Sequence, residues 1–130
     1  MAEANVGKRR IWAGRILSAI PVLLMVLSAT MKLVGGPEMM RNWASFGYPP
    51  STLVPIGILE IACALLYVIP RTSVLGAAFV TAYLGGAVAT HVRVLQPAAV
   101  GPALLGALAW VGLYLREARL RPLFPWRSDG

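Results

Sequence analysis

The feature that most constrains the fold is the apolar run from Thr52 to Pro70, which contains one carboxylate, Glu60. A helix needs about 20 apolar residues, rising about 1.5 Å each, to cross the hydrocarbon core of a bilayer. An acidic residue near the centre of such a helix costs roughly 3 kcal/mol, whereas each Leu, Ile or Val favours insertion by about 0.3 to 0.6 kcal/mol. Because ten such residues lie between Leu53 and Ile69, we predict a membrane span that carries a buried charge.

The composition places the whole chain in the same class. Of its 130 residues, 58% are hydrophobic and only 13% are charged, with a mean hydropathy of +0.70. Soluble domains have about 25% charged residues. Four spans of about 20 residues would use most of the length and leave no room for a separate catalytic domain. We therefore predict a single membrane domain over residues 1–130, and the sequence leaves open whether it is an enzyme.

The order of apolar segments and helix breakers predicts an all-α fold, a four-helix transmembrane bundle. The predicted segments are spans at about 11–34, 53–69, 74–95 and 98–115 and a basic tail at 116–130. Pro21 lies inside the first span. A membrane helix tolerates a kink at proline when neighbouring helices satisfy the freed carbonyl group. Pro37 follows two glycines and begins a segment in which Trp43 and Phe46 recur at helical spacing, which predicts a short interfacial helix. Trp43 and Tyr48 fit the aromatic belt at headgroup level.

Smaller signals concern how the spans begin and how they pack. Ser51 and Ser73 precede the second and third spans and are expected to cap them. Residues with small side chains recur along the last two spans, and their spacing predicts close packing between helices. They are Ala78, Ala82 and Gly86, beside Ala77, Thr81, Gly85 and Ala89, in the third span, and Gly101, Gly106, Ala109 and Gly112 in the fourth.

The net charge of +7 is distributed unevenly along the predicted topology. Nine Lys and Arg residues fall on the side of the two termini and the 70–73 turn, and three (Lys32, Arg41 and Arg93) fall on the other side. The positive-inside rule then places both termini in the cytoplasm, with the protein in the cell membrane. Arginines and apolar residues mix in the tail, as expected of a surface anchor for anionic lipid. No recognition helix or aromatic platform indicates nucleic acid as a partner.

Three polar residues on different spans are predicted to meet near the extracytoplasmic side. Measured from the outer ends of the spans, Lys32, His91 and Glu60 lie roughly 3, 6 and 10 Å deep. Helical side chains lean towards the N-terminus of their own helix, so Lys32 and His91 point inwards while Glu60 points outwards. We therefore expect an ion pair between Lys32 and Glu60, with His91 nearby.

Several residues around this cluster are also candidates for the site. Ser28 lies one turn before Lys32 and adds a hydroxyl group, and Tyr67 shares a helix face with Glu60. His91 is the one histidine, so a metal site is not predicted, and a hydrogen bond to Glu60 or titration near it is expected instead. Arg93 should point away from His91, towards headgroups.

The chemistry of this cluster allows two readings that the sequence does not separate. The pair of Lys32 and Glu60 can be a salt bridge that fixes the register of two helices, as a membrane protein requires of buried charges. The same groups can also form a site for a ligand, a proton or a quinone. Cys63 is the one cysteine, which excludes an internal disulfide or a CxxC redox pair and favours a packing role.

Five segments together resemble the DoxX-like family of small four-helix membrane proteins. They are MKLVG at 31–35, FGYP at 46–49, GILEIACALLYVIPRT at 57–72, LGGAVATHVR at 84–93 and GLYLREARLR at 112–121. The family takes its name from a subunit associated with a terminal quinol oxidase, and some relatives are linked to thiosulfate or oxidative-stress redox complexes. The family offers no agreed catalytic residues to transfer. The lack of a second cysteine or of a histidine pair for haem argues against an independent redox centre.

The resemblance implies a non-catalytic subunit or accessory of a quinone-linked redox system, with a quinone as the possible cofactor. Its expected partners are the lipid bilayer and either subunits of a redox complex or further copies of the chain. One alternative is a binding or transport module for a small amphipathic or cationic ligand, with Glu60 as counter-ion. Another is a purely structural membrane partner.

Overall fold

The computed structural model describes residues 2–128, and the helices that it contains confirm the predicted all-α fold. The long helices are α1 (Ala2–Val34), α3 (Leu53–Val68), α4 (Ser73–Arg93) and α5 (Val100–Arg116), and α2 (Pro37–Ser45) is short. Together with the 3-10 turns η1 (Pro50–Thr52), η2 (Pro70–Thr72) and η3 (Pro97–Ala99), the long helices form four segments that are long and apolar enough to cross a membrane. Met1 and residues 129–130, the last of the predicted tail, lie outside the described residues.

α1 is longer than the predicted first span, because the helix begins at Ala2 rather than near residue 11. Residues 2–10 are polar but contain no proline, so nothing in them stops the helix from continuing. Its 33 residues correspond to about 50 Å, against a hydrocarbon core of about 30 Å. α1 is therefore longer than the hydrocarbon core that it would cross. Pro21 is buried within α1 and does not end it.

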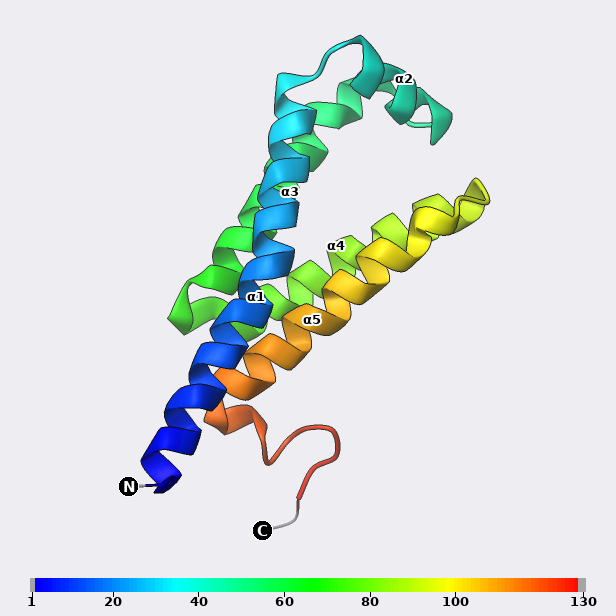
Figure 1. Cartoon of the computed structure of the whole chain (residues 1–130). Coiled ribbons are helices and arrows are strands. Elements are labelled where there is room, and N and C mark those ends of the chain that lie inside the picture. The colour runs from blue at the N-terminus through cyan, green and yellow to red at the C-terminus, as the bar shows by residue number, and fades with distance from the viewer. Residues whose placement is uncertain (1, 129–130) are drawn as a thin grey trace.

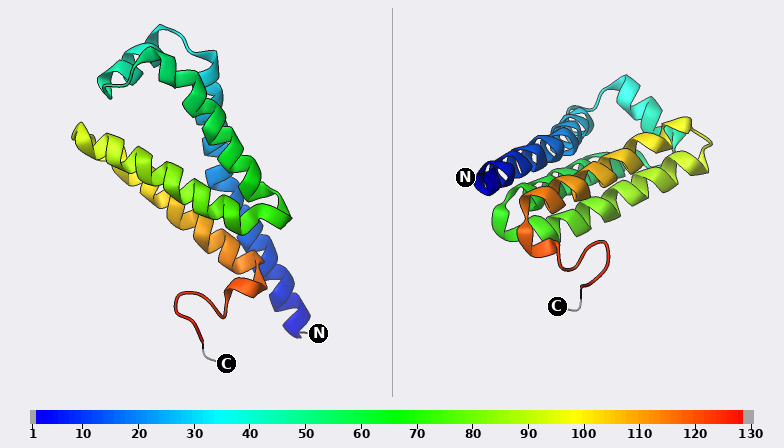
Figure 2. Two further views of the ribbon diagram at one scale, coloured as in Figure 1. Left: turned by 180° about the vertical axis from the view of Figure 1, so that it is seen from behind. Right: turned by 60° about the horizontal axis from the view of Figure 1, so that its bottom comes forward.

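The four long helices form a ring in which α1 contacts α3, α3 contacts α4, α4 contacts α5, and α5 returns to α1. Figures 1 and 2 show α1 with α3 as one pair and α4 with α5 as a second pair, and the pairs diverge towards α2. Both ends of the chain lie at the opposite end of the bundle. We call the end that carries α2 the cap end and the opposite end the terminal end.

Glycines bring the helices into backbone contact at the terminal end. A Cβ atom added to Gly14 would lie 2.7 Å from the carbonyl oxygen of Gly112, so α1 and α5 touch there. A Cβ atom at Gly76 would lie 2.2 Å from the backbone nitrogen of Tyr67, where α3 meets α4. The expected packing role of Gly112 is thus confirmed, and these contacts make the terminal end the tightly packed part of the bundle.

Of the small residues predicted to pack along α4, Ala77 is buried in the core and the others are exposed. Ala78, Ala82 and Gly86 are exposed, and no atom of the described residues lies within 4 Å of a Cβ atom added to Gly86. The inward face of α4 is instead the one that carries Gly76 and Val80. Small residues at intervals of four lie on two faces of this helix, and the sequence does not show which of these faces is buried.

The outward faces of the helices carry large apolar side chains. Leu23, Leu27, Ile58, Leu65 and Leu104 are each more than half exposed. Soluble proteins rarely expose contiguous apolar surface of this kind. The exposed side chains are those expected of helices that face lipid.

α3 and α4 do not begin with the serine caps that the sequence predicted. α3 and α4 each follow a 3-10 turn. Their N-cap residues are Thr52 and Thr72, where the sequence predicted Ser51 and Ser73. Ser73 is the first residue of α4, and its hydroxyl group donates to the carbonyl oxygen of Ile69 at 3.0 Å. The prolines at 50 and 70 start these turns, because their fixed φ angle suits the first position of a helix.

A candidate ligand site beneath α2

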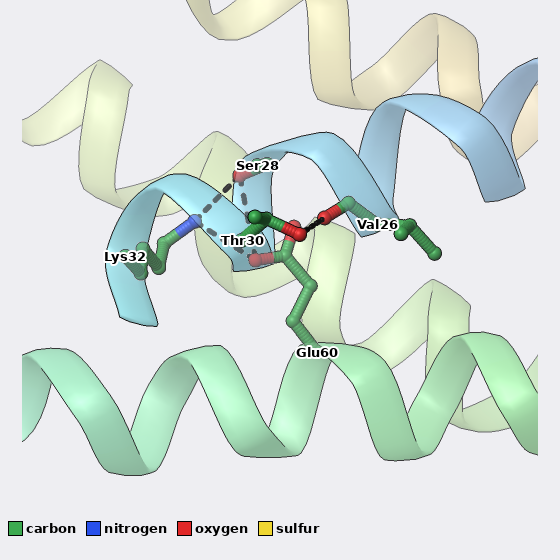
Figure 3. A network of polar contacts seen from close by, with 5 residues as sticks. All are labelled: Val26, Ser28, Thr30, Lys32 and Glu60. Carbon is green, nitrogen blue, oxygen red and sulfur yellow. Dashed lines mark hydrogen bonds and ion pairs between the residues drawn. The ribbon is translucent and has the colours of Figure 1, made fainter. Parts of the chain in front are cut away.

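Lys32 of α1 and Glu60 of α3 form the predicted ion pair. The Lys32 Nζ atom lies 2.8 Å from the Glu60 Oε2 atom, and the side chains are 12% and 4% exposed. The Lys32 ammonium group also donates to the Ser28 Oγ atom at 2.6 Å, and the Ser28 hydroxyl group lies 3.4 Å from the same carboxylate oxygen. Figure 3 shows the three side chains meeting between the two helices. The predicted contacts of Lys32 and Ser28 with Glu60 are therefore confirmed.

Local sequence explains why these groups can meet. Ser28 and Lys32 are four residues apart and so share one face of α1. Gly57 lies on the face of α3 that carries Glu60, and a Cβ atom added there would lie 3.2 Å from the Lys32 Cβ atom. The absence of a side chain at Gly57 lets α1 and α3 approach closely enough for the ion pair.

The ion pair lies on the wall of a partly open cavity of about 560 Å³ at the cap end. α1, α2, α3, α4 and α5 all contribute to its lining, which is more apolar than polar. Its polar members are Ser28, Lys32, Asn42, Tyr48, Glu60, Tyr83, Thr90 and His91. Ligand sites typically have about 300 to 1,000 Å³ and few polar groups in an apolar lining. The cavity therefore has the size and chemistry of a small-molecule site.

α2 covers the cavity because its apolar side packs against the rest of the chain. Trp43 and Phe46 are buried in a cluster with Leu53, and the Trp43 indole N–H group donates to the Thr52 Oγ1 atom at 3.0 Å. The predicted helix is present, but Trp43 is 6% exposed and Tyr48 is half-buried, so these two residues pack inside the protein rather than in a belt facing lipid.

The end of α4 holds the segment that follows α2. The hydroxyl groups of Tyr48 and Thr90 form a hydrogen bond of 2.6 Å. Arg93 donates to the carbonyl oxygen of Phe46, and its guanidinium group lies 5.8 Å from the centre of the Tyr48 ring. Arg93 thus binds the cover of the cavity, where the sequence predicted a contact with headgroups.

His91 lines the cavity but does not join the ion pair as expected. Its Nδ1 atom lies 2.7 Å from the carbonyl oxygen of Ala87, and its ring lies 5.1 Å from the ring of Phe46. Among residues 2–128, no hydrogen bond connects His91 with Glu60. The Nδ1 atom of His91 thus contacts the backbone one turn earlier, and the ring lies beside Phe46 on another part of the cavity wall.

Tyr67 belongs to a different network from Glu60 and is not among the residues that line this cavity. Its hydroxyl group bonds to the carbonyl oxygen of Ala109 at 2.6 Å and to the Ser18 Oγ atom at 2.9 Å. Arg116 donates to the same Ser18 atom at 3.1 Å. Tyr67 follows Glu60 by seven residues, which is about 10 Å along a helix. Tyr67 and Glu60 share a face of α3, but they lie at different positions along the helix axis.

Four polar residues of the cavity were not predicted as site residues: Asn42, Tyr48, Thr90 and Tyr83, of which Tyr83 of α4 lies beside Glu60. Tyr83 is half-buried, lines the cavity, and lies close enough to Glu60 for the two side chains to interact. Tyr83, Ala87 and His91 follow each other at intervals of four residues, so they share one face of α4. That spacing from His91 could have identified Tyr83 from the sequence.

The fold and the cavity define a four-helix membrane protein with a mainly apolar pocket that contains an ion pair. The DoxX-like family matches residues 16–112, about three quarters of the chain, and the protein belongs to this family. No curated protein and no solved structure shows a significant match.

Proposed function

We propose that this protein binds a quinone-type molecule in the cavity beneath α2 and acts as a non-catalytic subunit or accessory of a quinone-linked redox system. The observation that carries the proposal is the pair of Lys32 and Glu60 on the wall of an otherwise largely apolar cavity. The link of the DoxX-like family name to a quinol oxidase subunit supports the redox context.

The polar groups of the cavity suit a ligand that only accepts hydrogen bonds. An ammonium group has three N–H donors, and Lys32 uses two of them in its bonds to Ser28 and Glu60. The third donor is available to a carbonyl oxygen of a quinone, and the Tyr83 hydroxyl group lines the same cavity beside Glu60. The aromatic rings at the α2 side of the cavity, Phe46 and Tyr48 among them, provide faces and edges for a flat ring. The apolar lining suits a hydrophobic tail.

The same contacts favour a neutral ligand over a cationic one. Glu60 could serve as counter-ion for a cationic ligand in binding or transport only if that ligand displaced Lys32, whose Nζ atom lies 2.8 Å from the carboxylate. In the purely structural alternative, the ion pair fixes α1 against α3 and the cavity holds only lipid. Both alternatives predict no specific response to quinones.

Two adjacent glycines of α4 provide a matched test. Gly85 and Gly86 are both exposed, and neither has an atom within 4 Å of an added Cβ atom, but only Gly86 lines the cavity. We expect a short-tailed ubiquinone analogue to raise the unfolding temperature of the purified protein in detergent. Gly86→Leu should abolish this shift by filling the cavity, whereas Gly85→Leu should retain it. Decyl alcohol, which has a tail but no quinone ring, should give no shift.

Three results would contradict the quinone proposal. They are no shift with either a ubiquinone or a menaquinone analogue, an equal shift with decyl alcohol, and an equal loss in both glycine variants.

Purification of the native complex in mild detergent tests the proposed role as a subunit or accessory of a redox system. Redox subunits should accompany the protein, and recovery of the chain alone or as a homo-oligomer would argue against an accessory role.

We further propose that the terminal end faces the cytoplasm and that the protein lies in the cell membrane. The distribution of nine and three basic residues supports this orientation. In a Cys63→Ala background, a cysteine at exposed Ser51 should react with an impermeant maleimide added to intact cells, and one at exposed Ser128 should not. The reverse pattern would invert the orientation.

A further inference from the structure

A second cavity, of about 490 Å³, lies at the terminal end of the bundle and plays no part in the proposed quinone site. Its lining comes from α1, from the α3–α4 connection and from the end of α5, and it includes Arg15, Ser18, Tyr67, Arg116 and Glu117. We infer that this cavity binds one anionic phospholipid, with the phosphate group held by Arg15 and Arg116.

Arg116 is held in place by the protein. Its Nε atom donates to the Ser18 Oγ atom at 3.1 Å, its Nη2 atom donates to the carbonyl oxygen of Tyr67 at 3.3 Å, and its guanidinium group lies 4.9 Å from the centre of the Tyr67 ring. A guanidinium group has five N–H donors, and these bonds use two. A fixed guanidinium group with further donors can bind phosphate without the cost of ordering a free side chain.

The charges of the cavity match a phosphodiester group. Arg15 and Arg116 contribute two positive charges and Glu117 contributes one negative charge, which leaves one net positive charge. The Glu117 carboxylate accepts a hydrogen bond from the backbone nitrogen of Arg119 at 3.2 Å, so it has a partner within its own turn. Phosphatidylglycerol carries a single negative charge, whereas the choline group of phosphatidylcholine cancels that of its phosphate.

The apolar part of the cavity extends in the direction that an acyl chain requires. Val22 and Leu23 line it, and they lie seven and eight residues after Arg15, or about 10 to 12 Å along α1. The cavity thus has cations at the end near the interface and an apolar wall deeper in the bilayer. This arrangement favours a lipid over a free anion, which would use only the charged end.

Two matched pairs of variants test the site: one pair changes its charge, and the other changes the space inside it. Arg15 and Arg71 are both exposed arginines at the terminal end, and Ala13 and Ala19 are both exposed alanines of α1; in each pair only one residue, Arg15 or Ala19, lines the cavity. Arg15→Gln should weaken binding of phosphatidylglycerol about fivefold, since one basic residue near the surface contributes about that factor. Ala19→Leu should weaken it while both arginines remain.

The measurement is native mass spectrometry of the purified full chain titrated with phosphatidylglycerol, with phosphatidylcholine and inorganic phosphate as separate probes. We expect one bound phosphatidylglycerol that survives in Arg71→Gln and Ala13→Leu. Equal binding of phosphatidylcholine would overturn the inference. So would equal loss in Arg71→Gln and Arg15→Gln, full binding in Ala19→Leu, or competition by inorganic phosphate at the same concentration as the lipid.

Discussion

The two ends of the bundle solve the same problem, that of polar side chains inside a membrane protein, in different ways. Each end places a serine of α1 beside a basic side chain, Ser28 with Lys32 at the cap end and Ser18 with Arg116 at the terminal end. At the terminal end the polar groups bond to backbone carbonyls where helices touch. At the cap end the helix pairs diverge and the ion pair faces a cavity. Polar groups at the terminal end therefore join helices to one another as well as lining a cavity, whereas the ion pair at the cap end lies on the wall of the larger, mainly apolar cavity.

The largest expected effect comes from separating the charges at the cap end. Lys32→Met should lower the free energy of unfolding by about 3 kcal/mol, because it leaves the Glu60 carboxylate buried without its partner. Adding Glu60→Gln should recover most of this loss. Denaturation of both variants in micelles measures the difference. Equal stabilities of the single and double variants would mean that water in the cavity already solvates Glu60.

Next in size is the effect of a methyl group at the terminal end. Gly76→Ala places a Cβ atom 2.2 Å from the backbone of Tyr67, and it should cost about 1 to 3 kcal/mol. Gly86→Ala, on the same helix beside the cavity, should change stability by less than about 0.5 kcal/mol. The same denaturation assay compares them. If both variants were equally stable, the terminal end would not be the tightly packed one.

Substitutions at Tyr67 and Tyr83 should separate the contribution to stability from the contribution to ligand binding. Tyr67→Phe should lower stability by about 1 kcal/mol, through loss of its bonds to Ser18 and Ala109, and leave binding of the ubiquinone analogue unchanged. Tyr83→Phe should weaken that binding severalfold with a smaller change in stability. Thermal unfolding with and without the analogue measures both quantities. The opposite pattern would assign the ligand to the terminal end.

The smallest expected effect concerns the cover of the cavity. Arg93→Gln removes the donor to the Phe46 carbonyl oxygen and the cation above the Tyr48 ring. We expect faster hydrogen exchange in α2, with a change in overall stability below about 1 kcal/mol. Arg41→Gln, an exposed position on α2 itself, is the control and should leave the exchange rates unchanged. Unaltered exchange in Arg93→Gln would show that Trp43 and Phe46 alone hold α2.

Hydrophobic runs and breakers predicted the four spans and the short helix because these signals are local. The contact of Lys32 with Glu60 was also predictable, since an unpaired charge in a span requires a partner and few were available. What could not be predicted depends on the angle between helices. The divergence of the two helix pairs decides that Tyr83 joins the cavity and that Arg93 meets Phe46. The helix face that Tyr67 shares with Glu60 also does not show that the two residues lie at different positions along α3.

The ring order of the helices determines which contacts a growing chain can make first. α1 and α3 are translated before α5, and domains form from the N-terminus during synthesis. Lys32 and Glu60 can therefore neutralise each other in a two-helix hairpin while the ribosome is still making α5, which lowers the barrier to inserting the carboxylate. Closure of the ring, through Gly14 against Gly112, has to wait for the last helix. A ribosome-arrested chain that is long enough for α3 to have left the exit tunnel should already contain the ion pair.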